Sequence, residues 1–358
     1  MMGDNILGTC FAMCPDKERY MREKEGLLHV FEIDERTKNT KRPKADPAKT
    51  IKEFSRPAAG RQMTDLSELR PGPVLLLTIR YLFTKVATRT DYDWSFIYAF
   101  IFDRLRAIRQ DTVIQRIDPI GSIQILELIV RFHVYGAQRL CTHPISSFDP
   151  KMNTQHLLEC LKHLLVCYDE CSRTKTDDLD IDVGIRNLYL GDSRPQMEAI
   201  YILLNLGDVH ALTRGLQLPE KYRKSKDVKL AMKISCAWYL KNYVRTCRLI
   251  NQLPPLLMYA ALCNLRNIKR DSLEIMSTGF SSKVFTFPGL KLQELLLYRD
   301  IDKVKADCKL YGLIFTNGNV QFEKARFKNS DQLAHPEMSF NQKKVHKLLP
   351  DILLGHVN

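Results

Sequence analysis

The chain has 358 residues, of which 45% are hydrophobic, enough for a globular core of about two or three domains. Its net charge of +13 at pH 7 predicts an anionic partner, either nucleic acid or an acidic protein. Asp4, Asp16 and Glu18 interrupt the N-terminus, and no run of 18 apolar residues exists, which argues against a signal peptide and a membrane span. The ten cysteines follow no compact spacing, so we expect reduced thiols in the nucleus or cytoplasm.

The first predicted helix covers Asp16–Glu25 and stops at Gly26. Pro15 suits the helix start, where no amide donor is needed, and Asp16 suits the positive end of the helix dipole. Glu18 and Arg22 form an i,i+4 pair. Because charged residues occur nearly all round this helix, we expect it to lie on a surface.

Cys10 and Cys14 lie four residues apart, just before this helix. Two thiols can share a metal ion, but zinc takes four ligands and no second close Cys/His pair follows at the usual spacing. We therefore interpret both as small apolar side chains that fix the entry of the helix. A metal-binding or reactive role is the alternative.

Residues 36–72 are polar and contain four prolines, which predicts an extended arm with short helical turns at most. Between positions 36 and 61, nine lysines and arginines face only Asp46 and Glu53. This charge run suits phosphate binding, but it also suits a merely solvated segment.

Strongly apolar helices are predicted next, over residues 73–87, 92–110, 123–140 and 154–171. In the second of them, Leu105 and Ile108 can face inward. Arg104, Arg106 and Arg109 then fan outward, as a soluble helix end or as a positively charged contact ridge.

In the helix over 154–171, Cys160, His163, Cys167 and Cys171 fall on one face, the spacing of a possible metal site. Leucines and Tyr168 share that stripe. Buried cysteine behaves as a small hydrophobe, so we interpret the stripe as core.

Short helices continue to about residue 280. Ser193–Gln196 reads as a capping box that opens a helix stopped by Gly207. Further helices are predicted over 209–216, 227–240, 243–253 and 256–276. The short links between them predict antiparallel neighbours in a right-handed α-solenoid of stacked hairpins, without a strict sequence repeat.

A second basic run lies within this solenoid, where ten lysines and arginines between positions 214 and 248 face only Glu220 and Asp227. We predict contacts with nucleic acid or an acidic partner. The residues proposed for these contacts are Lys221, Arg223, Lys224, Lys226, Lys229, Lys233, Arg245 and Arg248.

Residues 281–327 change character, with a strand at 284–287, helices at 290–298 and 301–310, and a hairpin over 313–322 that turns at Asn317-Gly318. This is a winged-helix order. Because lysines and aspartates balance in the second helix, we expect protein contact or packing there instead of base reading.

In the tail, 328–358, Val345 and four later leucines and isoleucines predict docking on a partner or on the protein itself. They also resemble a leucine-rich nuclear-export signal.

Together these features resemble the Sac-three/GANP family of nuclear-export scaffolds, a PCI-type family. The resemblance runs from about Gly8 to Phe327, and Phe11-Ala12 departs from the usual Pro-Asp. The residues that match the family motifs are Cys10, Met13, Cys14, Pro15, Glu18, Arg19, Arg56, Pro57, Gly60, Asp103, Arg104, Arg106 and Arg109.

The resemblance implies four parts: a motif and arm (1–72), a helical-repeat domain (73–280), a winged helix (281–327) and a tail (328–358). It implies a non-enzymatic scaffold without cofactor, which binds a second PCI protein, a small acidic Sem/DSS-type subunit and RNA in mRNA export. In length the chain is similar to the family's short animal member, whose class is associated with centrosome duplication and spindle assembly. A centrosome and spindle adaptor that binds no nucleic acid is therefore the alternative. The chain also has no Gly-rich phosphate loop, nucleophile elbow or zinc helix, which argues against an enzyme.

Overall fold

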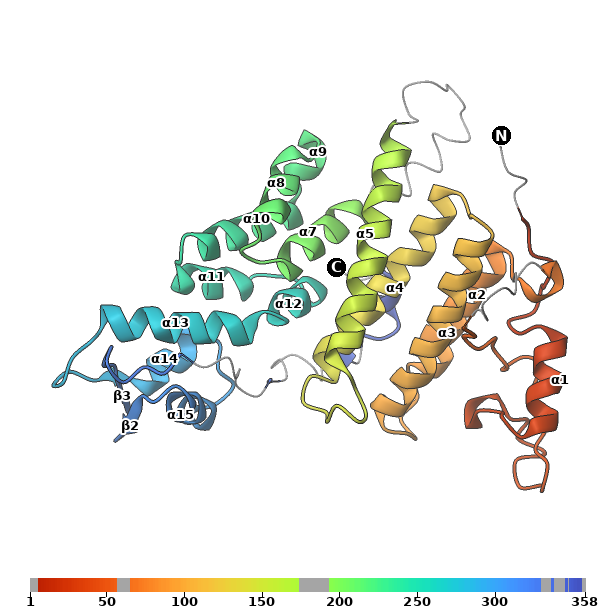
Figure 1. Cartoon of the computed structure of the whole chain (residues 1–358), viewed down its shortest axis with the longest axis horizontal. Helices are drawn as coiled ribbons and strands as arrows, with labels where there is room; N and C mark the ends of the chain where they lie inside the picture. Colours follow the sequence, from red (N-terminus) through yellow and green to blue (C-terminus); the bar gives the residue numbers. More distant parts are fainter. Residues whose placement is uncertain are drawn as a thin grey trace.

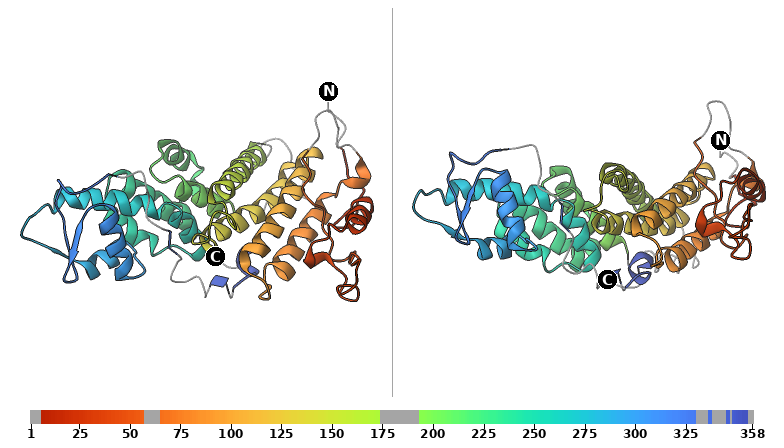
Figure 2. Two further views of the ribbon diagram at one scale, coloured as in Figure 1. Left: turned by 60° about the horizontal axis from the view of Figure 1, so that its bottom comes forward. Right: turned by 90° about the horizontal axis from the view of Figure 1, so that it is seen from below.

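The computed structural model describes residues 6–56, 65–173, 193–329, 336–337, 345–346 and 348–355. They form an elongated stack of helices with a small three-stranded sheet toward one end and the N-terminal arm at the other (Figure 1). The C-terminal residues return to the middle of the stack (Figure 2). The predicted mainly α, solenoid-like class is confirmed.

The N-terminal part follows the prediction closely. Helix α1 spans Asp16–Glu25, and Gly26 ends it with a left-handed φ of 70°, which glycine adopts without strain. From residue 27 to 56 the described chain forms no α-helix. It contains one 3-10 turn, Val30–Glu32, with hydrogen-bonded turns after Asp34 and Asp46, and a second 3-10 turn, Leu66–Glu68, precedes the helical stack. The arm is thus extended, as expected.

Four helices form the centre of the core. Helix α4 is buried along nearly its whole length because α2, α5 and later helices surround it, so apolar residues occur on most of its sides and its charged Arg131 is buried too. The predicted helices are present with ends shifted by a few residues. Their bounds are Gly72–Tyr81 for α2, continued by a π-helical turn over Leu82–Val86, Trp94–Ile114 for α3, Pro119–Arg139 for α4 and Pro150–Arg173 for α5.

Helix α7 spans Arg194–Leu204, but the predicted capping box at Ser193 is wrong. Ser193 has helical backbone angles and caps no amide. Its hydroxyl instead accepts a hydrogen bond from Arg131 Nη2 at 3.1 Å. Gly207, with φ of 83°, lies beyond the helix end.

The next helices match the predicted solenoid with two corrections. The predicted helix 256–276 is two helices, because Asn264 interrupts it and donates through Nδ2 to the carbonyls of Leu203 (2.9 Å) and Leu204 (3.0 Å), at the end of α7. The short α9 was not predicted. The bounds are Val209–Gln217 for α8, Glu220–Arg223 for α9, Lys226–Tyr239 for α10, Tyr243–Ile250 for α11, Pro255–Leu262 for α12 and Leu265–Gly279 for α13.

The segment that follows, residues 281–329, is called the sheet unit below. Its strands pair antiparallel in the order β1-β3-β2, and Asn317 and Gly318 both have positive φ in the hairpin turn, the requirement of a type I′ turn. The predicted order of strand, two helices and hairpin is confirmed. The bounds are Phe287–Pro288 for β1, Gly289–Leu295 for α14, Ile301–Leu310 for α15, Ile314–Thr316 for β2 and Asn319–Gln321 for β3.

The tail packs on the protein itself, one of the two predicted outcomes. Its helix α17, Asp351–Leu354, lies against α4. Val345, Ile352 and Leu353 are buried, and Tyr135 Oη lies 2.8 Å from His346 Nδ1. An export receptor would reach these apolar side chains only if the segment left α4.

Burial of His133 in α4 lowers its pKa to about 4, whereas an unfolded histidine titrates near 6.5. Between these pH values the unfolded chain binds the extra proton, so stability falls as pH drops from about 6.5 to 4. We expect this residue to account for up to about 3 kcal/mol of that loss. Chemical unfolding of a His133→Gln variant should show a weaker pH dependence, while a variant of exposed His210, His210→Gln, should match the parent. Identical pH profiles for His133→Gln and the parent would contradict this assignment.

Candidate functional site

The N-terminal motif is organised around one buried carboxylate, that of Glu32, which is 0% exposed. It accepts hydrogen bonds from Arg22 Nη1 at 2.7 Å, Arg104 Nη2 at 3.1 Å and the Ile51 amide at 2.9 Å. Glu53 Oε1 bridges the same two arginines, at 3.1 and 2.9 Å. This charge cluster joins α1, the arm and α3. Arg22 is therefore buried, although α1 was expected to lie wholly on the surface.

The motif cysteines are structural. Both are buried, and Cys14 Sγ lies 3.3 Å from Arg22 Nη2, so its surroundings are more polar than predicted. Burial raises the pKa of the Cys14 thiol to about 12, and burial also raises the pKa of the Cys10 thiol above its ordinary value. Both thiols are therefore protonated and poorly nucleophilic at neutral pH. No three His, Cys, Asp or Glu side chains in the described residues could hold a metal ion, the Cys160 stripe included.

A second buried carboxylate, Asp111 at the end of α3, fixes the arm further along. It accepts from Lys52 Nζ at 2.6 Å and Arg70 Nε at 2.7 Å. Arg70 Nη1 also donates to the Met13 carbonyl at 3.1 Å. Lys52 is thus removed from the basic run that was considered for phosphate binding.

The predicted outward ridge of arginines on α3 is wrong. Arg104 is buried in the charge cluster. The Arg106 guanidinium lies 3.7 Å from the centre of the Phe54 ring, and Arg109 Nη1 lies 2.9 Å from Glu159 Oε2. The arm and α5 supply aromatic and acidic partners that the local sequence of α3 does not show.

Several of the remaining motif residues also hold the arm against α1 and α3. Glu18 Oε1 accepts from the Glu53 amide at 2.8 Å, and Asp103 Oδ2 accepts from the Phe54 amide at 3.2 Å. Arg19 pairs with the exposed Asp16 at 2.7 Å. Pro15 precedes α1, Met13 packs against the core and Arg56 is exposed, while Pro57 and Gly60 lie outside the described residues.

Sequence reasoning missed Glu32 and Glu53 as members of this cluster. Arg22 was noticed only for its pair with Glu18, which the structure retains at 3.3 Å. No local pattern marks Glu32, because its cationic partners lie 10 and 72 residues away. The sequence signal that could have linked them is that the N-terminal motif and the arginine-rich segment of α3 occur together in the family resemblance.

The eight cations predicted to contact nucleic acid or an acidic partner are all exposed, on α9–α11 and the links between them. We call them the α9–α11 basic surface. Lys224 pairs with Glu220, and none of the other seven has a carboxylate within 4.0 Å in the described part of the chain. Arg214, from the same run, instead turns inward to Glu198 at 2.9 Å and Asp169 at 3.1 Å.

The helical period explains this outward orientation. On α10, Val228, Ala231, Ile234 and Trp238 are buried, so Lys226, Lys229 and Lys233 face solvent on the opposite side. On α11, Cys247 and Ile250 are buried and the arginines lie outside. These helices project from one side of the stack, away from α1 and the arm (Figure 1).

A contiguous stretch at the start of the sheet unit exposes large apolar side chains. Val284 and Phe285 are 82% and 79% exposed, and Phe280 and Leu290 are also exposed. We call these four residues the 280–290 apolar surface. Four large apolar side chains exposed within eleven residues of sequence make this segment a candidate protein-binding surface.

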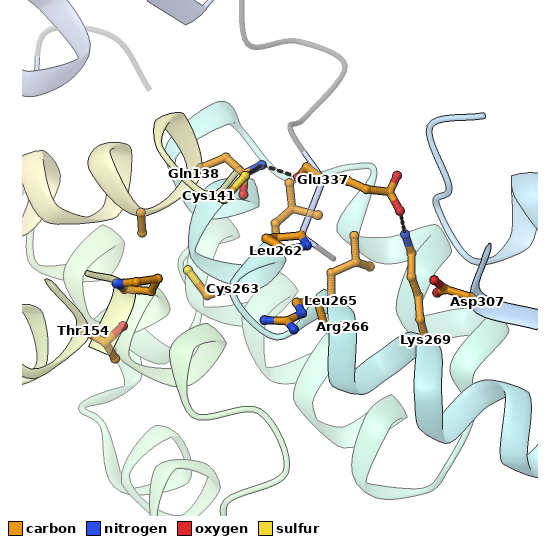
Figure 3. Close-up of a pocket in the computed structure, with 13 residues that line it drawn as sticks. Gln138, Cys141, Thr154, Leu262, Cys263, Leu265, Arg266, Lys269, Asp307 and Glu337 are labelled. Atoms are coloured by element: carbon orange, nitrogen blue, oxygen red, sulfur yellow. Dashed lines mark hydrogen bonds and ion pairs between the residues drawn. The ribbon is translucent and has the colours of Figure 1, made fainter. Parts of the chain in front are cut away.

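A cavity of about 140 Å³ lies where the stack, the sheet unit and the tail meet (Figure 3). Lys269 and Glu337 at its edge form an ion pair of 2.7 Å, and Glu337 Oε2 accepts from the Arg299 amide at 3.0 Å. Asp307 accepts from Tyr298 Oη at 2.8 Å. Because these charged groups are paired within the protein, we interpret the region as a structural joint.

No helix in the described residues is long and apolar enough to cross a membrane.

Comparison with known proteins agrees with this picture. A family model described as SAC3/GANP family matches residues 13–317. The chain is 26% identical to SAC3 family protein 1 of Schizosaccharomyces pombe, over 88% of this chain and 31% of that protein. It is 28% identical to Protein xmas of Drosophila melanogaster, over 68% of this chain and 11% of that protein. It is 25% identical to SAC3 family protein B of Arabidopsis thaliana, over 83% of this chain and 19% of that protein. It thus spans less than a third of the length of these relatives.

The buried cluster predicts unequal costs for two arginine substitutions on α3. Arg104→Met removes a cation from buried Glu32 and should lower the free energy of unfolding by about 3 kcal/mol or more. Arg109→Met removes a half-exposed pair with Glu159 and should cost less than about 1 kcal/mol. Urea unfolding of the two variants measures the difference, and equal costs would contradict the role given to Glu32.

Proposed function

Because the chain belongs to the SAC3/GANP family, a family of scaffold proteins, we propose that it acts in nuclear mRNA export by binding RNA on the α9–α11 basic surface. The carrying observation is the exposure of all eight predicted cations, seven of them without a carboxylate in reach among the described residues. Unpaired surface lysines and arginines bind phosphates with release of counterions. By contrast, the buried arginines of the N-terminal motif, Arg22 and Arg104, form ion pairs with Glu32 inside the protein.

The proposed protein partners are a second PCI-domain protein and a small acidic Sem/DSS-type subunit, bound at the 280–290 apolar surface. Exposed Val284 and Phe285 lie just before β1, and Leu290 lies on α14 directly after it. In α15, Lys305 Nζ pairs with Asp302 at 3.0 Å, which supports protein contact over base reading by this helix. We propose action in both nucleus and cytoplasm.

Neutralising Lys224, Lys226, Lys229 and Lys233 to glutamine should weaken RNA binding and flatten its salt dependence. Each lost phosphate contact lowers the slope of log K against log salt by about 0.7 for a single strand, so four contacts lower it by about 3. The measurement is fluorescence anisotropy of a labelled RNA across a salt series.

The matched control removes the same charge from the arm, where Lys38, Lys41, Arg42 and Lys44 are also exposed. Their replacement by glutamine should leave the slope nearly unchanged. Equal losses from both variants would show that RNA responds only to total charge. Unchanged binding in the first variant would remove the RNA part and favour the centrosome and spindle adaptor.

Phe285→Asp with Leu290→Asp should abolish partner binding and leave RNA binding intact, because a buried interface side chain replaced by a charge costs about 2 kcal/mol or more. Leu77→Asp, at a position of α2 whose side chain is 61% exposed, is the control. Affinity purification of tagged chains with mass spectrometry reads out the partners. Recovery of a PCI protein with a Sem/DSS-type subunit by the parent and control alone is expected, whereas recovery by the parent and both variants would place the interface elsewhere.

A further inference from the structure

The α9–α11 basic surface offers little aromatic area to an RNA base. Between residues 219 and 250 the aromatic side chains are Tyr222, Trp238, Tyr239 and Tyr243. Tyr222 and Trp238 are each 7% exposed, and Tyr243 is half-buried. Tyr239 is the exposed one, at 54%.

The rings nearest to the cations are already engaged. Lys221 Nζ lies 4.4 Å and Arg194 Cζ 4.7 Å from the centre of the Tyr222 ring. Lys241 Nζ lies 5.4 Å from the centre of the Trp238 ring. A ring face that carries a cation in this way is not free to stack on a base.

Proteins that bind single strands combine a basic track with aromatic side chains on which successive bases stack. Here the basic track is present, but Tyr239 is the single exposed ring among the four aromatic side chains of residues 219–250. Double-helical RNA needs no such platform, because its bases are paired and proteins contact its phosphates and 2′-hydroxyls.

The cations also lie in two rows. Lys226, Lys229 and Lys233 follow one side of α10 at a spacing of three and four residues, a line of about 10 Å at 1.5 Å per residue. Arg245 and Arg248 form a second row on α11, which packs against α10. Packed helices lie about 8–10 Å apart, so a duplex that contacts both helices would meet one row of cations with each backbone.

We propose that the α9–α11 basic surface binds double-helical RNA through both phosphate backbones, without base stacking. This inference rests on the proposed RNA-binding function and names the class of RNA. It assigns α10 and α11 one strand each.

The test compares a fully paired RNA duplex with poly(U) of the same number of phosphates, both bound to the full chain across a salt series. The duplex should bind about tenfold more tightly. Tyr239→Ala should change either dissociation constant by less than about twofold, whereas loss of a stacking ring weakens binding by about five- to 150-fold.

Two further variants address the rows separately. Lys229→Gln with Lys233→Gln, and Arg245→Gln with Arg248→Gln, should each lower the slope of log K against log salt for the duplex by about 2. Equal or tighter binding of poly(U), a stacking-sized loss in Tyr239→Ala, or no effect of the α11 pair would overturn the duplex inference while RNA binding itself stands. If the parent chain binds neither RNA, the proposed function fails instead.

Discussion

The buried carboxylate of Glu32 is the constraint on which the N-terminal third of the structure depends. Residues 27–56 bury few apolar side chains, chiefly Phe31, Ala45 and Ile51, so hydrophobic burial alone does not fix their path over α3. A carboxylate removed from water is costly unless cations and amides replace its hydration. The path observed brings Arg22, Arg104 and the Ile51 amide to it together. The charge cluster therefore selects one arrangement of the arm.

The two basic runs of the chain show why a local charge count is ambiguous. In the first run, Lys52 is buried in an ion pair with Asp111, which lies 59 residues away. In the second, Arg214 turns inward to acids of α5 and α7, and Lys224 pairs with its neighbour Glu220. The lysines of a basic run remain as unpaired surface charges only where the fold places no carboxylate near them. The local sequence does not show where distant carboxylates will lie.

Helical periodicity predicted most of this fold because the apolar side chains that each helix buries recur at the helical period within that helix's own sequence. The errors occur where a side chain serves a distant element. Asn264 splits a predicted helix to hydrogen-bond the end of α7. Ser193 does not cap α7 because its backbone angles are helical, and its hydroxyl accepts from the distant Arg131 instead. In the candidate site, the exposed cations of α10 and α11 were predictable from the same periodicity, whereas the burial of Arg104 was not.

Described residues of the tail contact both the stack and the sheet unit. Glu337 pairs with Lys269 of α13 and accepts from the Arg299 amide of the sheet unit, and α17 lies against α4. Helix α11, which carries Arg245 and Arg248, also contacts α14, which carries Leu290. The leucine-rich pattern of the tail is accounted for by its packing against α4, because Leu349, Ile352 and Leu353 are buried there.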